Sequence, residues 1–211
     1  MIRNIIFDLG GVFFEIDKNQ AIRRFQEVGF NDAVHYLDAF EQVGIFGQLE
    51  GGQIDAEEFR ERLSRLAGKE MTLDDCAHGW QGYFVRLPQR NLDKLLELRK
   101  RGYRVSLLSN TNPFMMQWVL SDAFDGHGHG ISHYFDALYL SYQMRLMKPD
   151  ARIFEAVLRN EQARPDETVF IDDGPRNVAT AAALGMHTLQ PDNGGDWHAM
   201  LEQLIANHSL L

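Results

Sequence analysis

The chain has 211 residues, of which 45% are hydrophobic, 24% charged and 11% aromatic. This composition is typical of a globular protein with a sizeable core, and it excludes disordered and fibrous proteins. Acidic residues outnumber basic residues by 30 to 21, which gives a formal net charge of −9. Because such a charge repels phosphate backbones, we expect no nucleic-acid partner.

The N-terminal residues run directly into an apolar segment and lack the pattern of a secretory signal peptide. No run approaches the roughly 18 uninterrupted apolar residues that a membrane-spanning helix needs. With a single cysteine, Cys76, the chain cannot form an internal disulfide. We therefore expect a cytoplasmic protein without a membrane partner.

Short apolar runs in chain order predict buried strands, and amphipathic segments between them predict helices. The runs cover 2–9, 103–108, 137–140, 168–171 and 186–189. The amphipathic segments cover 88–101, 150–160 and 175–184. Strands buried on both faces that alternate with helices are typical of parallel sheets. The sequence therefore predicts an α/β fold, a Rossmann-like doubly wound parallel sheet.

The segment 17–87 interrupts this alternation, because it contains no convincing buried strand. Its amphipathic segments cover 20–28, 33–43, 56–66 and 73–84, and a turn-like Glu50-Gly51-Gly52-Gln53 separates the second from the third. We predict that 17–87 is an α-helical cap inserted after the first strand. The core is then formed by 1–16 and 88–211.

Polar side chains follow the predicted strands where each strand ends. They are Asp8, then Ser109 and Asn110, then Lys148, and last Asp172 and Asp173. Because ligands bind beyond the carboxyl ends of parallel strands, we expect these side chains to converge at one edge of the sheet. Each residue alone is equally typical of a turn or a helix cap, so the prediction rests on the ordered set.

This set fits phosphoryl transfer through a covalent aspartyl phosphate. The carboxylate of Asp8 can attack phosphorus, but it repels a phosphate dianion unless Mg²⁺ lies between them. Asp172 and Asp173 supply further oxygen ligands, and a carbonyl near Gly10 can add another. Two neighbouring acids without a cation would destabilise each other, which favours a bound metal. The hydroxyl of Ser109 and the ammonium of Lys148 would hold the phosphate oxygens.

Four short motifs occur in order: FDLGGV at 7–12, LLSN at 107–110, MKPD at 147–150 and FIDD at 170–173. In these motifs, and in a cap between the first and the second, the chain resembles the haloacid dehalogenase superfamily. Within it, the chain is most similar to the capped bacterial phosphatases of the α-D-glucose-1-phosphate phosphatase type. The resemblance implies a Mg²⁺-dependent phosphatase that hydrolyses a small phosphorylated metabolite, such as a sugar phosphate.

The resemblance also implies a role for each matching residue. Asp8 is the nucleophile, Ser109 and Asn110 contact phosphate or substrate, and Lys148 neutralises the phosphate. Asp172 and Asp173 hold Mg²⁺ together with Asp8 and Gly10, and Asn177 has a supporting role.

One position departs from the common pattern of the superfamily. Most of its phosphatases carry a second Asp two residues after the nucleophile, which protonates the leaving oxygen, whereas this chain has Gly10. The sugar-phosphatase branch shares this Gly. Because general acid–base assistance contributes roughly 10²- to 10⁴-fold, we predict slow turnover and a preference for good leaving groups. A replacement acid from Glu15, Asp17 or the cap stays open.

Two other functions compete with the phosphatase. A 2-haloacid dehalogenase uses the same Asp nucleophile without a metal, but it has no use for the acidic pair Asp172-Asp173. A phosphate-binding or regulatory domain that has lost turnover agrees with Gly10, but not with the retention of Asp8 and Lys148.

The remaining polar and aromatic clusters are expected to be structural. His127, His129 and His133 have the spacing of metal ligands, but a Gly-rich surface loop is the preferred interpretation. Trp80, Tyr83 and Phe84 are expected in the core rather than on a sugar-stacking surface. Cys76 is expected to be a buried thiol. The resemblance implies a different role for the Gly51-Gly52 turn, as the element of the cap that reaches into the site and contacts the substrate.

Overall fold

A five-stranded sheet with the order β5-β4-β1-β6-β7 lies at the centre of the computed structural model, which describes residues 1–209. Every neighbouring pair of strands in this sheet is parallel. The strands are β1 (Asn4–Phe7), β4 (Arg104–Ser109), β5 (Ala137–Leu140), β6 (Thr168–Ile171) and β7 (His187–Leu189). Each strand lies in or overlaps a predicted run, which confirms the α/β fold class.

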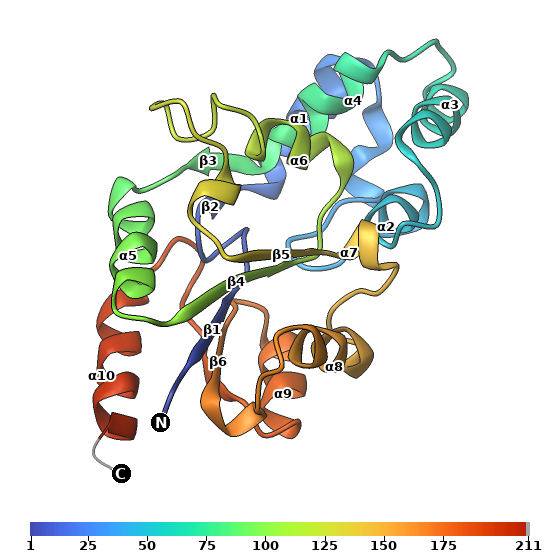
Figure 1. Cartoon of the computed structure of the whole chain (residues 1–211). Helices are drawn as coiled ribbons and strands as arrows, with labels where there is room; N and C mark the ends of the chain where they lie inside the picture. Colours follow the sequence, from blue (N-terminus) through green and yellow to red (C-terminus); the bar gives the residue numbers. More distant parts are fainter. Residues whose placement is uncertain (210–211) are drawn as a thin grey trace.

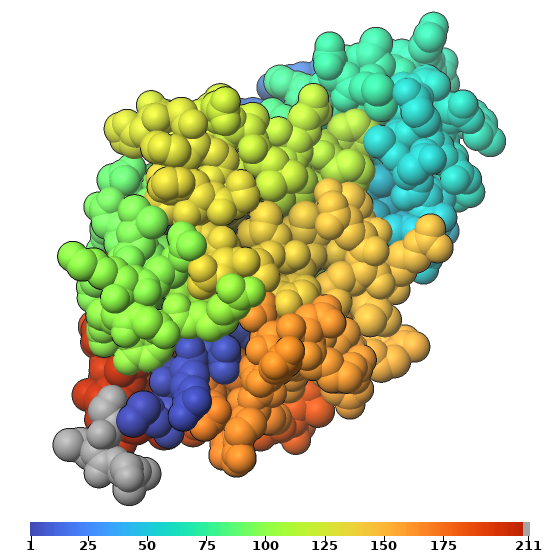
Figure 2. Space-filling model, in the orientation of Figure 1, coloured from blue at the N-terminus to red at the C-terminus, as the bar shows by residue number. Residues whose placement is uncertain are grey.

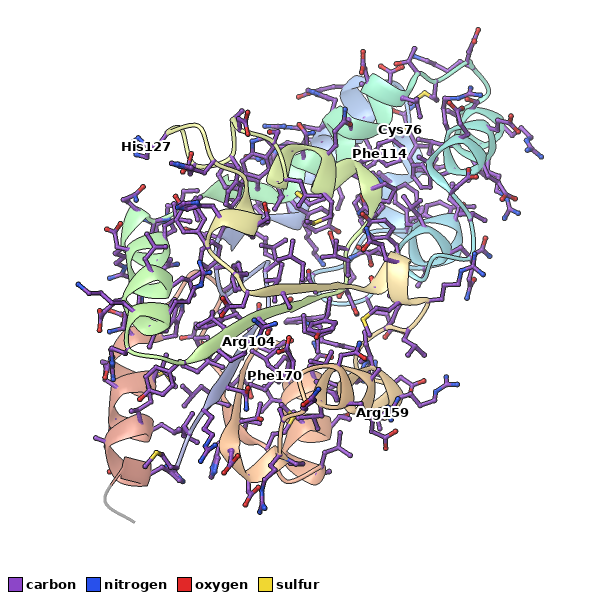
Figure 3. The ribbon with its side chains drawn as sticks, in the orientation of Figure 1. Cys76, Arg104, Phe114, His127, Arg159 and Phe170 are labelled. Atoms are coloured by element: carbon purple, nitrogen blue, oxygen red, sulfur yellow. The ribbon has the colours of Figure 1, made fainter. Side chains whose placement is uncertain are left out.

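Helices cover both faces of the sheet (Figure 1). On one face lie α5 (Gln89–Lys100) and α10 (His198–Ser209), and on the other lie α8 (Ala151–Asn160) and α9 (Pro175–Ala183). Alternate residues of β1 point to opposite faces: Ile5 and Phe7 belong to the cluster that includes α5 and α10, and Ile6 to the cluster that includes α8. Figure 3 shows Phe170 of β6 between the sheet and α8.

The amphipathic pattern predicted α5, α8 and α9 correctly but missed α10 and two shorter helices at the sheet edge. α6 (Pro113–Val119) follows β4, and α7 (Ser141–Met144) follows β5. Most residues of α6 are buried, so the helix has no polar face that would produce a helical period. Among the described residues, no helix is both long and apolar enough to cross a membrane.

Between β1 and α5 the chain forms a helical insertion with a small ribbon at its base. The helices are α1 (Lys18–Glu27), η1 (Asn31–His35), α2 (Gly44–Glu50), α3 (Ala56–Ala67), α4 (Leu73–Trp80) and η2 (Gln81–Tyr83). The ribbon pairs β2 (Glu15–Ile16) with β3 (Phe84–Arg86) in antiparallel orientation. No sequence pattern indicates β3, because a three-residue strand is too short to show a period of two.

The predicted amphipathic helix over 33–43 is wrong. Only η1 is helical there, and α2 begins at Gly44. The side-chain amide of Gln42 makes two hydrogen bonds to the backbone of Asp38. It accepts one from the Asp38 N–H at 2.9 Å and donates one to the Asp38 carbonyl at 3.1 Å. These local side-chain bonds replace the hydrogen bonds of a helix.

Aromatic side chains fill the interior of the insertion and connect it to the sheet. Phe46 meets Phe59 edge to face with ring centroids 5.0 Å apart, and Phe59 packs on Phe114 of α6 at 5.7 Å. One buried apolar cluster therefore continues from the insertion into the sheet layer. In Figure 2 the atoms of the insertion (cyan) lie directly against those of the neighbouring core segments (yellow-green to orange).

Candidate active site

A pocket that is partly open to solvent lies at the carboxyl ends of the central strands, beneath the insertion. The sheet side contributes Asp8, Gly10, Ser109, Asn110, Lys148, Asp173 and Asn177 to its lining. The insertion contributes Ala39, Phe40, Gln42, Glu50, Trp80 and Tyr83. Segments far apart in the sequence thus meet around one space.

Strand order brings the predicted nucleophile and the predicted cation together. Asp8 follows β1 directly, and the neighbouring strand β4 ends at Ser109. The Nζ of Lys148 lies 2.8 Å from the Oδ1 of Asp8 and 2.6 Å from the Oδ2 of Asp172, and it donates to the carbonyl of Leu108 at 3.0 Å. Because the side chain of Lys148 is 1% exposed, this ion pair is shielded from water.

The two neighbouring acids after β6 occupy different environments. Asp172 is fully buried, and its Oδ1 accepts hydrogen bonds from the Gly174 N–H at 2.7 Å and from the side chain of Asn177 at 3.0 Å. Asp173 lines the pocket, and Asp172 does not. The contact with Asn177 agrees with the supporting role expected for that residue.

Asp8, Asp172 and Asp173 each offer a carboxylate oxygen to one cluster whose atoms lie within 4.8 Å of one another. Burial raises the pKa of Asp8 to about 7, against the opposing effect of Lys148, and the two other acids raise it further. Burial and the neighbouring Asp172 likewise raise the pKa of Asp173 to about 6. One buried lysine thus does not balance this group of acids, and a divalent cation would favour their charged forms.

Two glycines after Asp8 shape this cluster. A Cβ on Gly11, whose φ is +80°, would lie 2.1 Å from the Oδ2 of Asp173. Only glycine allows the Asp173 carboxylate to approach the backbone so closely. At Gly10 a Cβ would lie 3.2 Å from the Cγ2 of Ile16, so a side chain there would require Ile16 to shift.

Ser109 and Asn110 both line the pocket but differ in how their side chains are used. The hydroxyl of Ser109 makes only a long contact of 3.4 Å to the Asn110 carbonyl. The amide of Asn110 donates to the Lys148 carbonyl at 2.8 Å and accepts from the Lys148 N–H at 2.9 Å. The Asn110 side chain therefore fixes the backbone of Lys148, while the Ser109 hydroxyl is available to a ligand.

The insertion adds a carboxyl group that the sequence analysis did not single out. Glu50, the last residue of α2, is 6% exposed and lines the pocket. Burial raises its pKa to about 8, a hydrogen bond from Asn112 lowers it, and the charge of Asp8 raises it again. The sequence signal was limited to the Gly51-Gly52 turn, which was expected to reach into the site.

The other candidate residues do not line the pocket or are bonded to other groups. Glu15 pairs with Arg86 at 2.5 Å, and Asp17 caps α1 through the Asn19 N–H at 2.8 Å. Neither Glu15 nor Asp17 lines the pocket within the described part of the chain. Burial raises the pKa of the Cys76 thiol to about 12, as expected for a structural cysteine.

The histidine-rich segment is a surface loop whose tip carries His127 (Figure 3). Asp125 accepts hydrogen bonds there from the backbone N–H groups of His127 and His129, and from the Tyr134 hydroxyl. Within residues 1–208, the only side-chain group with the spacing of a metal site is the cluster of Asp8, Asp172 and Asp173.

Trp80 and Tyr83 are 1% and 7% exposed, as expected for core residues, yet both also line the pocket. The Tyr83 hydroxyl donates to the Asp38 carbonyl at 2.8 Å. These two aromatic residues therefore form part of the core and part of the wall of the site.

Comparison with known proteins agrees with this geometry. The family model of haloacid dehalogenase-like hydrolases matches residues 2–185. D-ribitol-5-phosphate phosphatase from Bacteroides thetaiotaomicron is 43% identical over 97% of this chain and 99% of its own length.

Solved structures agree as well. A HAD-like family hydrolase from Porphyromonas gingivalis superimposes with a TM-score of 0.92 at 41% identity, over 97% of this chain and 98% of the other. A HAD family enzyme from B. thetaiotaomicron, in complex with magnesium and inorganic phosphate, gives 0.87 at 37% identity, over 95% of this chain and 99% of the other. The chain belongs to the haloacid dehalogenase-like hydrolase family.

Proposed function

We propose that the protein is a Mg²⁺-dependent phosphatase that hydrolyses the phosphomonoester of a small sugar or polyol through an aspartyl phosphate. The observation that carries this proposal is the position of Asp8, which lines the pocket, pairs with the ammonium of Lys148 at 2.8 Å and shares one carboxylate cluster with Asp173. A nucleophile, a cation for phosphate and a group of metal ligands thus share one small space.

The residues divide the chemistry between them. Asp8 Oδ attacks phosphorus and the bond to the leaving oxygen breaks, so the phosphoryl group is transferred to Asp8. Lys148 and the Ser109 hydroxyl hold phosphate oxygens as charge develops on them. Water then attacks phosphorus and releases inorganic phosphate from Asp8.

Asp8, Asp173 and the Gly10 carbonyl would hold Mg²⁺, and the Asp172 carboxylate would complete the acidic cluster behind them. Mg²⁺ prefers such oxygen ligands. The hydrogen bonds that the Asp172 carboxylate accepts from Gly174 and Asn177 fix the orientation of that carboxylate. When bound, the ion offsets the repulsion between the Asp8 carboxylate and a phosphate dianion.

We assign residues 17–87 as a cap and 1–16 with 88–211 as the catalytic core. The cap supplies one side of the pocket wall, including Gln42, Glu50 and Tyr83. A cap in this position excludes water and selects the leaving group.

The substrate class follows from the wall of the pocket. The wall combines polar side chains, among them Gln42 and Thr111, with the apolar surface of Phe14 and Met115. The similar phosphatase of B. thetaiotaomicron acts on D-ribitol 5-phosphate, so a linear polyol or sugar phosphate is the first substrate to examine.

A dehalogenase is disfavoured by the acidic cluster, since a site that releases halide without a metal has no use for Asp172 and Asp173 together. The dehalogenase structures that resemble this chain are 16–18% identical to it and share the fold alone.

The test is phosphate release from a panel of polyol, sugar and aryl phosphates, measured with Mg²⁺ and with a chelator. We expect release that needs Mg²⁺ and is lost in Asp8→Ala. A folded wild-type protein that releases no phosphate from any substrate would refute the proposal, as would an Asp8→Ala variant with full activity.

A further inference from the structure

In the described part of the chain, the position two residues after the nucleophile offers no acidic side chain that could protonate the leaving group. Transfer of phosphate from a sugar or polyol leaves an alkoxide, a poor leaving group that requires a proton. Gly10 cannot supply it, and Ile16 occupies the space that a side chain at this position would enter. Glu15 and Asp17 are bonded elsewhere and do not line the pocket in the part of the chain that the structure describes.

Glu50 is a carboxyl group of the cap that lies in the same pocket as Asp8 and is shielded from water. The buried cation of the site, Lys148, is paired with Asp8 and Asp172 rather than with Glu50. A buried carboxyl without a cationic partner favours its protonated form. Glu50 is therefore suited to donate a proton.

Hydrogen bonds to the core fix the position of Glu50. The Ser141 hydroxyl donates to the Glu50 carbonyl at 2.7 Å and accepts from the Thr111 N–H at 2.9 Å. These bonds join the end of α2 to the loop that follows Ser109. At Gly52 a Cβ would lie 2.1 Å from the Tyr142 carbonyl, so the turn after Glu50 also lies against the core.

The carboxyl of Glu50 is oriented by the start of α6. Asn112 caps that helix with its Oδ1, which accepts from the N–H groups of Phe114 and Met115, each at 3.1 Å. Its amide nitrogen donates to the Glu50 side chain. The charged groups that act on Glu50 are Asp8 and Lys148. The charge of Glu50 in turn raises the pKa of the Tyr83 hydroxyl.

We propose that Glu50 is the general acid–base of this phosphatase and that the cap supplies it in place of the residue missing at Gly10. The assignment rests on the proposed function. As Asp8 attacks phosphorus, the bond from phosphorus to the leaving oxygen breaks, and that oxygen takes the proton of Glu50. The alcohol departs and Glu50 remains as a carboxylate.

In the second step, the Glu50 carboxylate takes a proton from the attacking water. The water oxygen bonds to phosphorus, the bond from phosphorus to Asp8 breaks, and inorganic phosphate leaves. Glu50 is protonated again and Asp8 is again a carboxylate, so protons and charge balance over the cycle.

The experiment compares Glu50→Gln with wild type on an alkyl substrate, D-ribitol 5-phosphate, and on an aryl phosphate with an acidic phenol as leaving group. Gln keeps the shape of the side chain and an oxygen for Asn112. We expect kcat/KM for the alkyl phosphate to fall about 10²- to 10⁴-fold, and the first turnover of the aryl phosphate to change far less. The phosphorylated enzyme should accumulate with the aryl substrate, visible as a burst of phenol and in the mass of the acid-quenched protein.

Glu15→Gln is the matched control, since it removes another carboxylate near the base of the cap, and it should retain wild-type rates on both substrates. Equal losses of rate on both substrates, without accumulation of phosphoenzyme, would overturn the assignment. Such a result would indicate that the Glu50 side chain only maintains the structure of the site. Unchanged alkyl phosphatase activity in Glu50→Gln would also overturn it.

A measurement on the wild-type enzyme covers the case in which the variant does not fold. With Glu50 as acid, the rate of the first step should depend weakly on the basicity of the leaving group, and a steep dependence would overturn the assignment. Failure of the phosphatase proposal is separate, since it would appear as absent phosphate release in wild type or as retained activity in Asp8→Ala.

Discussion

The approach of Gly11 to Asp173 allows the site geometry to be tested with one methyl group. Gly11 has a φ of +80°, and a Cβ there would lie 2.1 Å from the Oδ2 of Asp173. Gly11→Ala therefore introduces backbone strain and displaces a carboxylate that we assign to Mg²⁺.

Gly102 provides a matched control for the backbone strain. Its φ is +90°, and a Cβ there meets no atom within 4 Å. Forcing a left-handed conformation on a residue with a Cβ costs about 1–2 kcal/mol. Both Ala variants should therefore unfold at lower temperature, by about 2–4 °C for each kcal/mol in a chain of this size.

Only Gly11→Ala should change the response to metal. Loss of correct ligand orientation typically weakens metal binding about 10- to 100-fold, so its half-maximal Mg²⁺ concentration should rise by that factor. The assay is phosphate release across a Mg²⁺ titration, paired with thermal unfolding. The same Mg²⁺ dependence in Gly11→Ala and Gly102→Ala would refute the reasoning that this glycine positions Asp173.

Two further predictions concern the buried charges. Lys148→Met leaves Asp8 and Asp172 without their cation, so urea unfolding near neutral pH should show that the free energy of unfolding falls by about 3–5 kcal/mol. The control, Arg176→Met, breaks an exposed ion pair with Glu41 and should change the free energy of unfolding little. Equal effects of the two substitutions would contradict the prediction. In chelator, thermal unfolding should show stability falling as pH rises from about 5 to about 8. The reason is that the pKa values of Asp8, Asp173 and Glu50 in the folded protein, about 7, 6 and 8, lie above the ordinary values of 3.8 for Asp and 4.5 for Glu. The folded state then retains protons that the unfolded chain has lost. Added Mg²⁺ should reduce this decline, and a stability that rises over this range would contradict the assignment of buried protonated acids.

The central sheet and the polar residues at its carboxyl edge could be predicted from the order of apolar runs in the chain. Strands in a sheet covered on both faces are mostly apolar, so β1, β4, β5, β6 and β7 are visible as short runs rich in apolar residues. In a parallel sheet, the residues after these runs must meet at the same edge. The sequence pattern alone therefore predicts that Asp8, Ser109 and Lys148 lie close together.

Local hydrogen bonds and short elements escaped the same reasoning. Asp38 and Gln42 bond to each other and end the helical pattern where periodicity predicted its continuation. β3 pairs with β2 through contacts between residues about seventy positions apart in sequence, and neither strand is long enough to have a pattern of its own.

The differences between the acids of the site arise from the packing of the folded chain. Asp172 and Asp173 are neighbours with the same side chain, yet one is fully buried beside Lys148 and the other faces the pocket. Glu50 lies far from Asp8 in sequence, and its burial and protonation depend on how α2 packs against the core. Sequence patterns record which residues follow a strand or face a core, whereas the charge state of a carboxyl depends on every group packed around it, and only the folded chain brings those groups together.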